Sequence, residues 1–167
     1  LMGYNARSSI ENCSECGISK YFITPGMRKE INIYGLWENY KDIQKAGYIV
    51  IFEAEKSVLK RDSRMDPTGG AIEGHVLSDE QVRIILGIGV EEVIIAMDND
   101  VPIEEVWNMC EKFYGLRKVS YIRDKWKLLG PKDSPADAPN KIYNFLFKWR
   151  IPYDESKHRE YLKSLKK

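Results

Sequence analysis

Residues 48–57 read YIVIFEAEKS, and the fold class can be inferred from them. Its first five residues are apolar and mostly β-branched or aromatic, without the alternation of a half-exposed strand. Such a run is typical of a strand buried on both faces, as in a parallel sheet. Residues 93–97 (VIIAM) repeat the pattern, and residues 118–122 form a third, weaker example. We therefore predict at least three strands of a mostly parallel sheet.

Helical patterns alternate with these strands. Gly47 is expected to end a helix over residues 36–46, since glycine accepts the left-handed C-cap conformation. Ser78 and Gln81 have the spacing of a capping box at a helix start. The other helices are expected over residues 56–64, after Pro102, over 140–149 and over 154–165, with Pro152 between the last two. This alternation implies right-handed crossovers and an α/β sheet with helices on both faces.

Two segments are predicted to lack regular structure for most of their length. Residues 8–30 are polar and rich in turn residues, so we expect a loop with a short extended piece near residues 21–23. Residues 67–70 (PTGG) are interpreted as a loop. The chain opens on Leu1 and reads as the end of an element already under way, which suggests a fragment of a longer protein.

The composition suits one globular domain. The 167 residues are 43% hydrophobic and 31% charged, which provides enough apolar material for a core. A mean hydropathy of −0.44 and the lack of a long apolar run argue against a membrane span. Three cysteines are too few for a disulfide framework, so we expect a reducing, cytoplasmic setting.

Carboxylates follow the strands predicted at residues 48–52 and 93–97. Glu53 and Glu55 come directly after the first, and Asp98 and Asp100 after the second. Ligands of open parallel sheets bind beyond the carboxyl ends of the strands. Carboxylates gathered there repel one another unless a divalent cation neutralises them, and oxygen ligands suit Mg²⁺ or Mn²⁺. The pattern, with Asp133 downstream, predicts a metal site for phosphoryl chemistry; the alternative is that acids gather there because loops begin there.

Five segments in chain order resemble one known family. They are residues 34–36 (YGL), 49–57 (IVIFEAEKS), 74–78 (GHVLS), 96–100 (AMDND) and 130–137 (GPKDSPAD). Together they resemble the Toprim domain in the RNA-polymerase core of bacterial and bacteriophage DNA primases. The resemblance implies a Rossmann-like, mostly parallel α/β sheet flanked by helices, followed by C-terminal helices.

The resemblance also implies roles for the acidic residues. Glu53 would act in general acid/base catalysis or hold metal, and Asp98 and Asp100 would be catalytic metal ligands. Asp133 would contribute to a second metal position. The implied activity is the Mg²⁺- or Mn²⁺-dependent addition of ribonucleotides to a primer on single-stranded DNA, with more than one ion. Its implied partners are the template, ribonucleoside triphosphates and a replicative helicase, with no membrane.

The resemblance divides the chain into three parts. Residues 1–47 would be the end of the N-terminal subdomain of the primase core with its connecting helix. Residues 48–139 would be the Toprim metal-binding domain, and residues 140–167 a C-terminal helical segment.

Three positions depart from the family pattern. Ala54 stands where the family usually has glycine, and Ser57 where bacterial primases carry an aspartate. The second aspartate of the late loop falls at Asp137, four residues after Asp133 rather than two. The alternatives are therefore a Toprim nuclease or topoisomerase-like enzyme, or a non-catalytic Toprim module that binds nucleic acid. Ala54 and Ser57 favour the module.

The sequence also contains weaker signals. Cys13 and Cys16 have a zinc-like spacing but lack two further ligands, so no zinc is expected. His75 is expected to be a loop or polar-surface residue, and its place in the turn that faces the crevice leaves a catalytic role as the alternative. Asp98 and Asp100 also fit a phosphatase pair, but the mid-chain position and the Pro102 that follows argue against it. Four aromatic residues could stack on bases or, more simply, pack the C-terminal helix: Tyr143, Phe145, Phe147 and Trp149.

The net charge of +1 conceals a division along the chain. Residues 51–111 hold 14 acids and 5 bases, whereas residues 112–167 hold 15 bases and 6 acids. The acidic part contains most of the expected metal site, and the basic part could follow a phosphate backbone. A solvated tail is the alternative for residues 157–167. The lysines expected to bind nucleic acid are Lys56, Lys125, Lys127 and Lys132.

Overall fold

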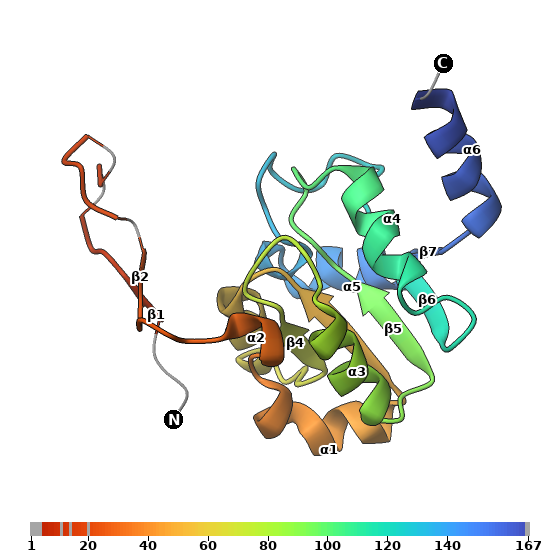
Figure 1. The fold of residues 1–167 in the computed structure, drawn as a ribbon, viewed down its shortest axis with the longest axis horizontal. Helices are drawn as coiled ribbons and strands as arrows, with labels where there is room; N and C mark the ends of the chain where they lie inside the picture. Colours follow the sequence, from red (N-terminus) through yellow and green to blue (C-terminus); the bar gives the residue numbers. More distant parts are fainter. Residues whose placement is uncertain (1–4, 11, 14, 20, 166–167) are drawn as a thin grey trace.

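A five-stranded sheet forms the centre of the molecule (Figure 1). The structure, a computed structural model, describes residues 5–10, 12–13, 15–19 and 21–165. The strands are β3 (Tyr48–Phe52), β4 (Gly69–Ala71), β5 (Glu92–Ile95), β6 (Lys118–Tyr121) and β7 (Ile151–Pro152). Their order is β4-β3-β5-β6-β7, with β7 antiparallel to β6 and all other neighbours parallel. The predicted mostly parallel α/β sheet is confirmed.

The sequence interpretation was wrong at both edge strands. Residues 67–70 were expected to be a loop, but Gly69–Ala71 pairs with β3. The glycines hid this strand because they permit close packing: a Cβ on Gly70 would lie 2.7 Å from the Ile33 side chain. Pro152 separates the two helices, as expected, but the strand β7 that contains it was missed; it lies at an edge of the sheet, where proline is tolerated.

Six α-helices and two 3₁₀-helices accompany the sheet in the described part of the chain. They are η1 (Lys29–Ile31), α1 (Leu36–Ala46), α2 (Glu55–Asp62), α3 (Asp79–Gly87), α4 (Ile103–Glu111), η2 (Pro135–Asp137), α5 (Asn140–Lys148) and α6 (Glu155–Leu165). Gly47 ends α1 with a φ of 74°, as predicted. The capping box is also confirmed, since the amide of Gln81 donates to Ser78 Oγ at 2.9 Å and the amide of Ser78 to Gln81 Oε1 at 3.0 Å.

Two hydrophobic cores cover the two faces of the sheet. Ile49 and Ile51 of β3 face a core that includes side chains of α1, α3 and α4. Val50 and Phe52 face the opposite core, which contains side chains of α2 and α5. α6 packs on α4, where the rings of Trp107 and His158 lie 5.5 Å apart. Helices therefore flank both faces, as predicted.

A hairpin projects from this body (Figure 1). It pairs β1 (Asn5–Arg7) with β2 (Tyr21–Ile23) in antiparallel register, which confirms the extended piece expected near residues 21–23. Residues 1–4, which the interpretation of the chain start included, lie outside the described residues. No helix in the described part of the chain has the length and apolarity that a bilayer crossing needs.

The strand order defines a switch point beside β3. The chain leaves β3 to pair β4 on one side and β5 on the other. Crossovers that depart in opposite directions leave a crevice at the carboxyl ends of the two strands. Glu53 follows β3, and Asp98 lies three residues beyond the end of β5. The fold therefore brings the two predicted acidic segments to one edge of the sheet.

Candidate functional site

Glu53 lies at the entrance to α2, immediately after the buried strand β3. Its Oε1 is 3.2 Å from Nδ1 of His75, which lies in the exposed loop between β4 and α3. Burial raises the pKa of Glu53, and the nearby carboxylates of Asp98 and Asp100 raise it further, while His75 acts in the opposite direction. His75 is thus the loop residue that the sequence predicted, and it faces the crevice.

Asp98 occupies the deepest position among these acids. Its Oδ1 is buried and has no hydrogen-bond partner among the residues that the structure describes. Burial raises the pKa of Asp98, followed by the charges of Asp137 and Asp100, and the hydroxyl of Ser134 and the ammonium of Lys56 offset part of the rise. A buried carboxylate oxygen without a partner is unusual in a folded protein and marks a position where a ligand could bind.

Asp100 belongs to the same group, since its charge raises the pKa of both Glu53 and Asp98. Asn99, between the two aspartates, ties this segment to the late loop. Its amide donates to the carbonyl of Asp133 at 3.0 Å, and its side-chain Nδ2 donates to the carbonyl of Gly130 at 3.2 Å. The predicted residues Glu53, Asp98 and Asp100 therefore form one electrostatic cluster.

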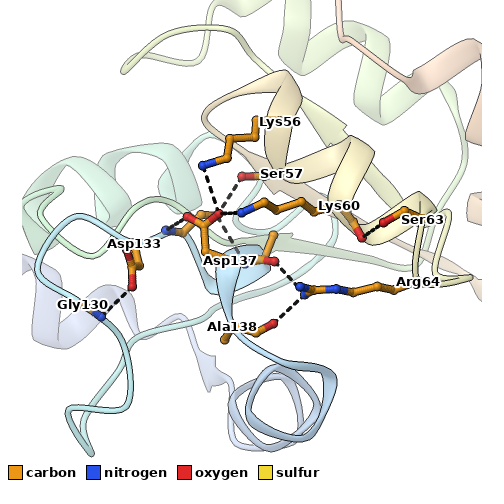
Figure 2. A network of polar contacts seen from close by, with 11 residues as sticks. Lys56, Ser57, Lys60, Ser63, Arg64, Gly130, Asp133, Asp137 and Ala138 are labelled. Atoms are coloured by element: carbon orange, nitrogen blue, oxygen red, sulfur yellow. Dashed lines mark hydrogen bonds and ion pairs between the residues drawn. The ribbon is translucent and has the colours of Figure 1, made fainter. Parts of the chain in front are cut away.

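The two aspartates of the late loop have different surroundings. Asp133 is exposed, and its Oδ2 accepts a hydrogen bond from the amide of Gly130 at 2.8 Å, which closes a turn of its own loop (Figure 2). Asp137, in η2, is the neighbouring charge with the largest effect on Asp98. The charge of Asp137, to which the sequence assigned no role, therefore raises the pKa of Asp98 more than any other neighbouring charge does.

Two lysines of α2 hold Asp137. Lys60 Nζ donates a hydrogen bond to Asp137 Oδ1, and Lys56 Nζ lies 3.5 Å from the same oxygen (Figure 2). The amide of Ser134 donates to Oδ2 at 3.0 Å. Burial opposes ionisation of this carboxyl, but these polar partners outweigh it and lower the pKa of Asp137. Asp137 therefore remains charged beside Asp98.

Further hydrogen bonds fasten the late loop to α2. Ser57 donates from its buried hydroxyl to Ser134 Oγ at 2.9 Å. Arg64 Nη1 donates to the carbonyl of Ala136 at 3.0 Å and also to that of Ala138 (Figure 2). The sequence contains two patterns from which part of this network could have been predicted. Ser134 and Asp137 have the spacing of a capping box, and Lys56 and Lys60 are four residues apart on one helix.

Carboxylate oxygens are the ligands that a hard divalent cation prefers. In the described part of the chain, no three His, Cys, Asp or Glu side chains are gathered closely enough to enclose an ion by themselves. Even so, the unpartnered Asp98 Oδ1 and the mutual repulsion of the carboxylates would both be relieved by Mg²⁺ or Mn²⁺. Glu53, Asp98 and Asp100 are the residues that could hold such an ion.

The lysines predicted to bind nucleic acid lie at the surface. Lys125, Lys127 and Lys132 are exposed on the loop between β6 and η2, whereas Lys56 borders the acidic cluster. Cys13 is buried and its thiol donates to the Ile10 carbonyl at 2.9 Å, while Cys16 is exposed.

The aromatic residues of the C-terminal region divide into two pairs. Tyr143 is buried under the guanidinium of Arg61, 3.5 Å from its ring centroid, and Phe147 packs against Tyr48. The expected packing role is confirmed for these two residues. Phe145 and Trp149 face solvent instead.

Comparisons with known proteins identify the fold. No protein-family profile matches the chain. The SPbeta prophage-derived uncharacterized protein YorJ of Bacillus subtilis is 29% identical over 176 residues, covering 90% of this chain and 46% of that protein. The zinc-binding and RNA polymerase domains of Aquifex aeolicus primase superpose with a TM-score of 0.77 at 18% identity, over 98% of this chain and 41% of theirs.

Other primases give the same result. The DnaG primase catalytic domain bound to single-stranded DNA matches with a TM-score of 0.70 at 15% identity, and the RNA polymerase domain of Mycobacterium tuberculosis DnaG with 0.68 at 18%. These matches cover 90% of this chain and 48% and 52% of those chains. The chain thus has the fold of bacterial primase catalytic cores, as the sequence resemblance implied, and spans about half their length.

Proposed function

We propose that this protein is the metal-dependent catalytic part of a DNA primase that joins ribonucleotides on single-stranded DNA. The observation that carries the proposal is the buried, unpartnered Asp98 Oδ1 in a carboxylate cluster at the switch point of a primase-like sheet. One structural neighbour is a primase domain bound to single-stranded DNA, and the Bacillus relative is prophage-derived. Both support a role in replication of phage or bacterial DNA.

The residues of the cluster have separate roles in the proposed reaction. The 3′-hydroxyl of the primer attacks the α-phosphorus of the incoming nucleotide, and the bond to pyrophosphate breaks. Glu53 accepts the hydroxyl proton as the general base. Asp98 and Asp100 would hold the divalent cation with it. When bound, that ion would neutralise charge on the attacking and leaving oxygens.

The side chains of α2 keep this arrangement in place. Lys60 and Arg64 hold η2 against the helix, so that Asp137 stays beside Asp98. Lys56 shares Asp137 with Lys60, but its side chain is largely exposed at the rim of the cluster. Its ammonium could therefore contact the triphosphate or the strand.

Ribonucleotide incorporation tests the proposal. The protein at its full natural length is incubated with a single-stranded template, labelled ribonucleoside triphosphates and Mg²⁺ or Mn²⁺. Labelled primers are expected, and Glu53→Gln should reduce their rate of synthesis by about 100-fold or more, the usual contribution of a general base. The matched control is Glu80→Gln, on the exposed side of α3. Equal rates for Glu53→Gln and the unchanged protein would overturn the role of Glu53.

A non-catalytic nucleic-acid-binding module is the second candidate. Two features favour it: the resemblance to primases leads one to expect an acid where Ser57 stands, and two lysines already neutralise Asp137. Strand binding without incorporation in the same assay would support this module, and degradation of the template would support a nuclease.

A further inference from the structure

Three large aromatic side chains gather on the outer side of α5. Trp126, Phe145 and Trp149 are 44%, 38% and 56% exposed. Phe145 and Trp149 are four residues apart at the end of α5, which places them on one side of the helix. The rings of Trp126 and Phe145 are 4.8 Å apart, edge to face. Grouped exposed rings of this size are typical of an interaction site.

The loop that carries Trp126 is held in a defined conformation. Asp124 Oδ1 accepts a hydrogen bond from the amide of Trp126 at 3.0 Å, and its Oδ2 accepts one from the amide of Leu129 at 2.7 Å. Lys127 between them has a φ of 57°, a left-handed conformation that a non-glycine residue adopts only where its surroundings hold it. The loop therefore presents Trp126 in a preorganised position, which reduces the entropy lost on binding.

Four lysines surround these rings. Lys125 and Lys127 flank Trp126 in the loop, and Lys141 and Lys148 lie on α5, four residues before and three after Phe145. All four are exposed, and none of them forms an ion pair with a described residue. Asp124, the acid beside Trp126 in the chain, has both oxygens occupied by amides. The surface thus combines flat rings with lysines that have no ion-pair partner among the described residues.

We propose that this surface binds single-stranded nucleic acid. Unpaired bases can stack on exposed rings while lysines bind the phosphates, and stacking tolerates any base sequence. A duplex keeps its bases stacked internally and offers no free faces to the rings. We call Trp126, Phe145 and Trp149, with Lys125, Lys127, Lys141 and Lys148, the stacking surface.

The stacking surface is connected to the acidic cluster. Gly130, four residues after Trp126, accepts a hydrogen bond from the side chain of Asn99, which lies between Asp98 and Asp100. Four residues span at most about 14 Å, which is a distance of a few nucleotides. A strand on the surface could therefore reach the cluster. This inference deepens the proposed function and rests on it for the role of the strand as template or product.

A binding assay tests the stacking surface without any chemistry. The protein is titrated into a labelled 20-nucleotide oligothymidylate in EDTA without nucleotides, and fluorescence anisotropy gives the Kd. Trp126→Ala and Trp149→Ala should each weaken binding by roughly 5- to 100-fold, the range expected for loss of one stacked base. Trp126→Phe keeps a ring and should retain most of the affinity. The matched control is Trp37→Ala, 89% exposed on α1 under the opposite face of the sheet, with no expected change.

The salt dependence separates the lysines from the rings. Lys125→Gln combined with Lys127→Gln should reduce the slope of log Kd against log salt by about 0.7 for each phosphate that is no longer neutralised. The inference is overturned if both tryptophan variants bind like the unchanged protein, if Trp37→Ala weakens binding equally, or if duplex DNA competes as well as the single strand. The binding assay contains neither metal nor ribonucleoside triphosphates, so a failure of primer synthesis would not change its result. A failure of strand binding at this surface would likewise leave the test of primer synthesis unaffected.

Discussion

Lys60 of α2 donates a hydrogen bond to the carboxylate of Asp137 in η2, across 77 positions of the chain. The hydrogen bond joins the helix that starts beside Glu53 to the loop that lies beside Asp98. It keeps Asp137 ionised although burial opposes its charge. Lys60 therefore fixes both the position and the charge of a carboxylate at the edge of the cluster.

Replacing this lysine should loosen the late loop. Lys60→Met removes a charge-assisted hydrogen bond from a half-buried carboxylate, so we expect the free energy of unfolding at pH 7 to fall by about 1–2 kcal/mol. The pKa of Asp137 is lowered in the folded state, so its stabilising effect is present above the unfolded value of about 3.9. That effect is lost as the pH falls through the lowered pKa, and the difference between the two proteins should shrink with it.

Urea unfolding at several pH values measures this difference. The matched control is Lys157→Met, which removes an exposed ion pair with Asp154 at 3.7 Å and should change stability by less than about 0.5 kcal/mol. A Lys60→Met difference that stays constant down to pH 2 would show that Lys60 does not act through the charge of Asp137.

The acidic cluster should reduce the stability of the metal-free protein. The pKa of Asp98 is raised by burial and by neighbouring carboxylates, so its charge destabilises the folded state above the usual aspartate pKa. Asp98→Asn should therefore raise the free energy of unfolding at pH 7 in EDTA. The gain should disappear below about pH 4, where Asp98 is protonated in both the folded and the unfolded state.

Thermal or urea unfolding in EDTA measures the increase in the free energy of unfolding of Asp98→Asn. Asp133→Asn serves as the comparison, because Asp133 is exposed and an amide oxygen can still accept the hydrogen bond of Gly130. A gain of the same size for Asp133→Asn would mean that general surface charge, rather than the cluster, sets the stability.

A buried ion pair joins the strands to the C-terminal segment. Arg150 donates from Nε and Nη2 to the two carboxylate oxygens of Glu92, each at 2.9 Å, and Ser120 Oγ donates to Oε1 at 2.7 Å. Burial opposes the charge of Glu92, but these hydrogen bonds outweigh it and lower its pKa. Arg150→Leu would leave a buried charge without its main partner, so we expect a loss of about 3 kcal/mol at pH 7.

The loss should diminish as the pH falls through the lowered pKa of Glu92, since protonation removes the charge that needs Arg150. Denaturant unfolding measures it, with Arg83→Leu as the control because Arg83 and Glu80 form an exposed pair 3.8 Å apart. Equal losses for the two variants would mean that the burial of Glu92 has no energetic consequence.

Local signals predicted the centre of the fold well. The apolar run at Tyr48–Phe52, the glycine at position 47 and the Ser78–Gln81 capping box each depend on neighbouring residues, and each has its predicted structure. β4 was missed because its glycines serve tertiary packing against Ile33 and Phe52, which no local pattern reveals.

Part of the candidate site could also be predicted from the sequence. Strand ends placed Glu53, Asp98 and Asp100 at one edge of the sheet, because parallel strands align their carboxyl ends. The position of Asp137 beside Asp98 could not be predicted from spacing. It depends on the hydrogen bond of Lys60 to η2, which is formed only when distant segments pack together.

The claim that Glu53, Asp98 and Asp100 hold a divalent cation is central to the account, and calorimetric titration with Mn²⁺ tests it most directly. The unchanged protein should bind with a clear heat and with an affinity that weakens as the pH falls, because protons compete for carboxylates with raised pKa values. Asp98→Asn should lose at least about tenfold in affinity, and Glu160→Gln, at an exposed position of α6, should bind like the unchanged protein. Equal heats and affinities for Asp98→Asn and the unchanged protein would contradict the account.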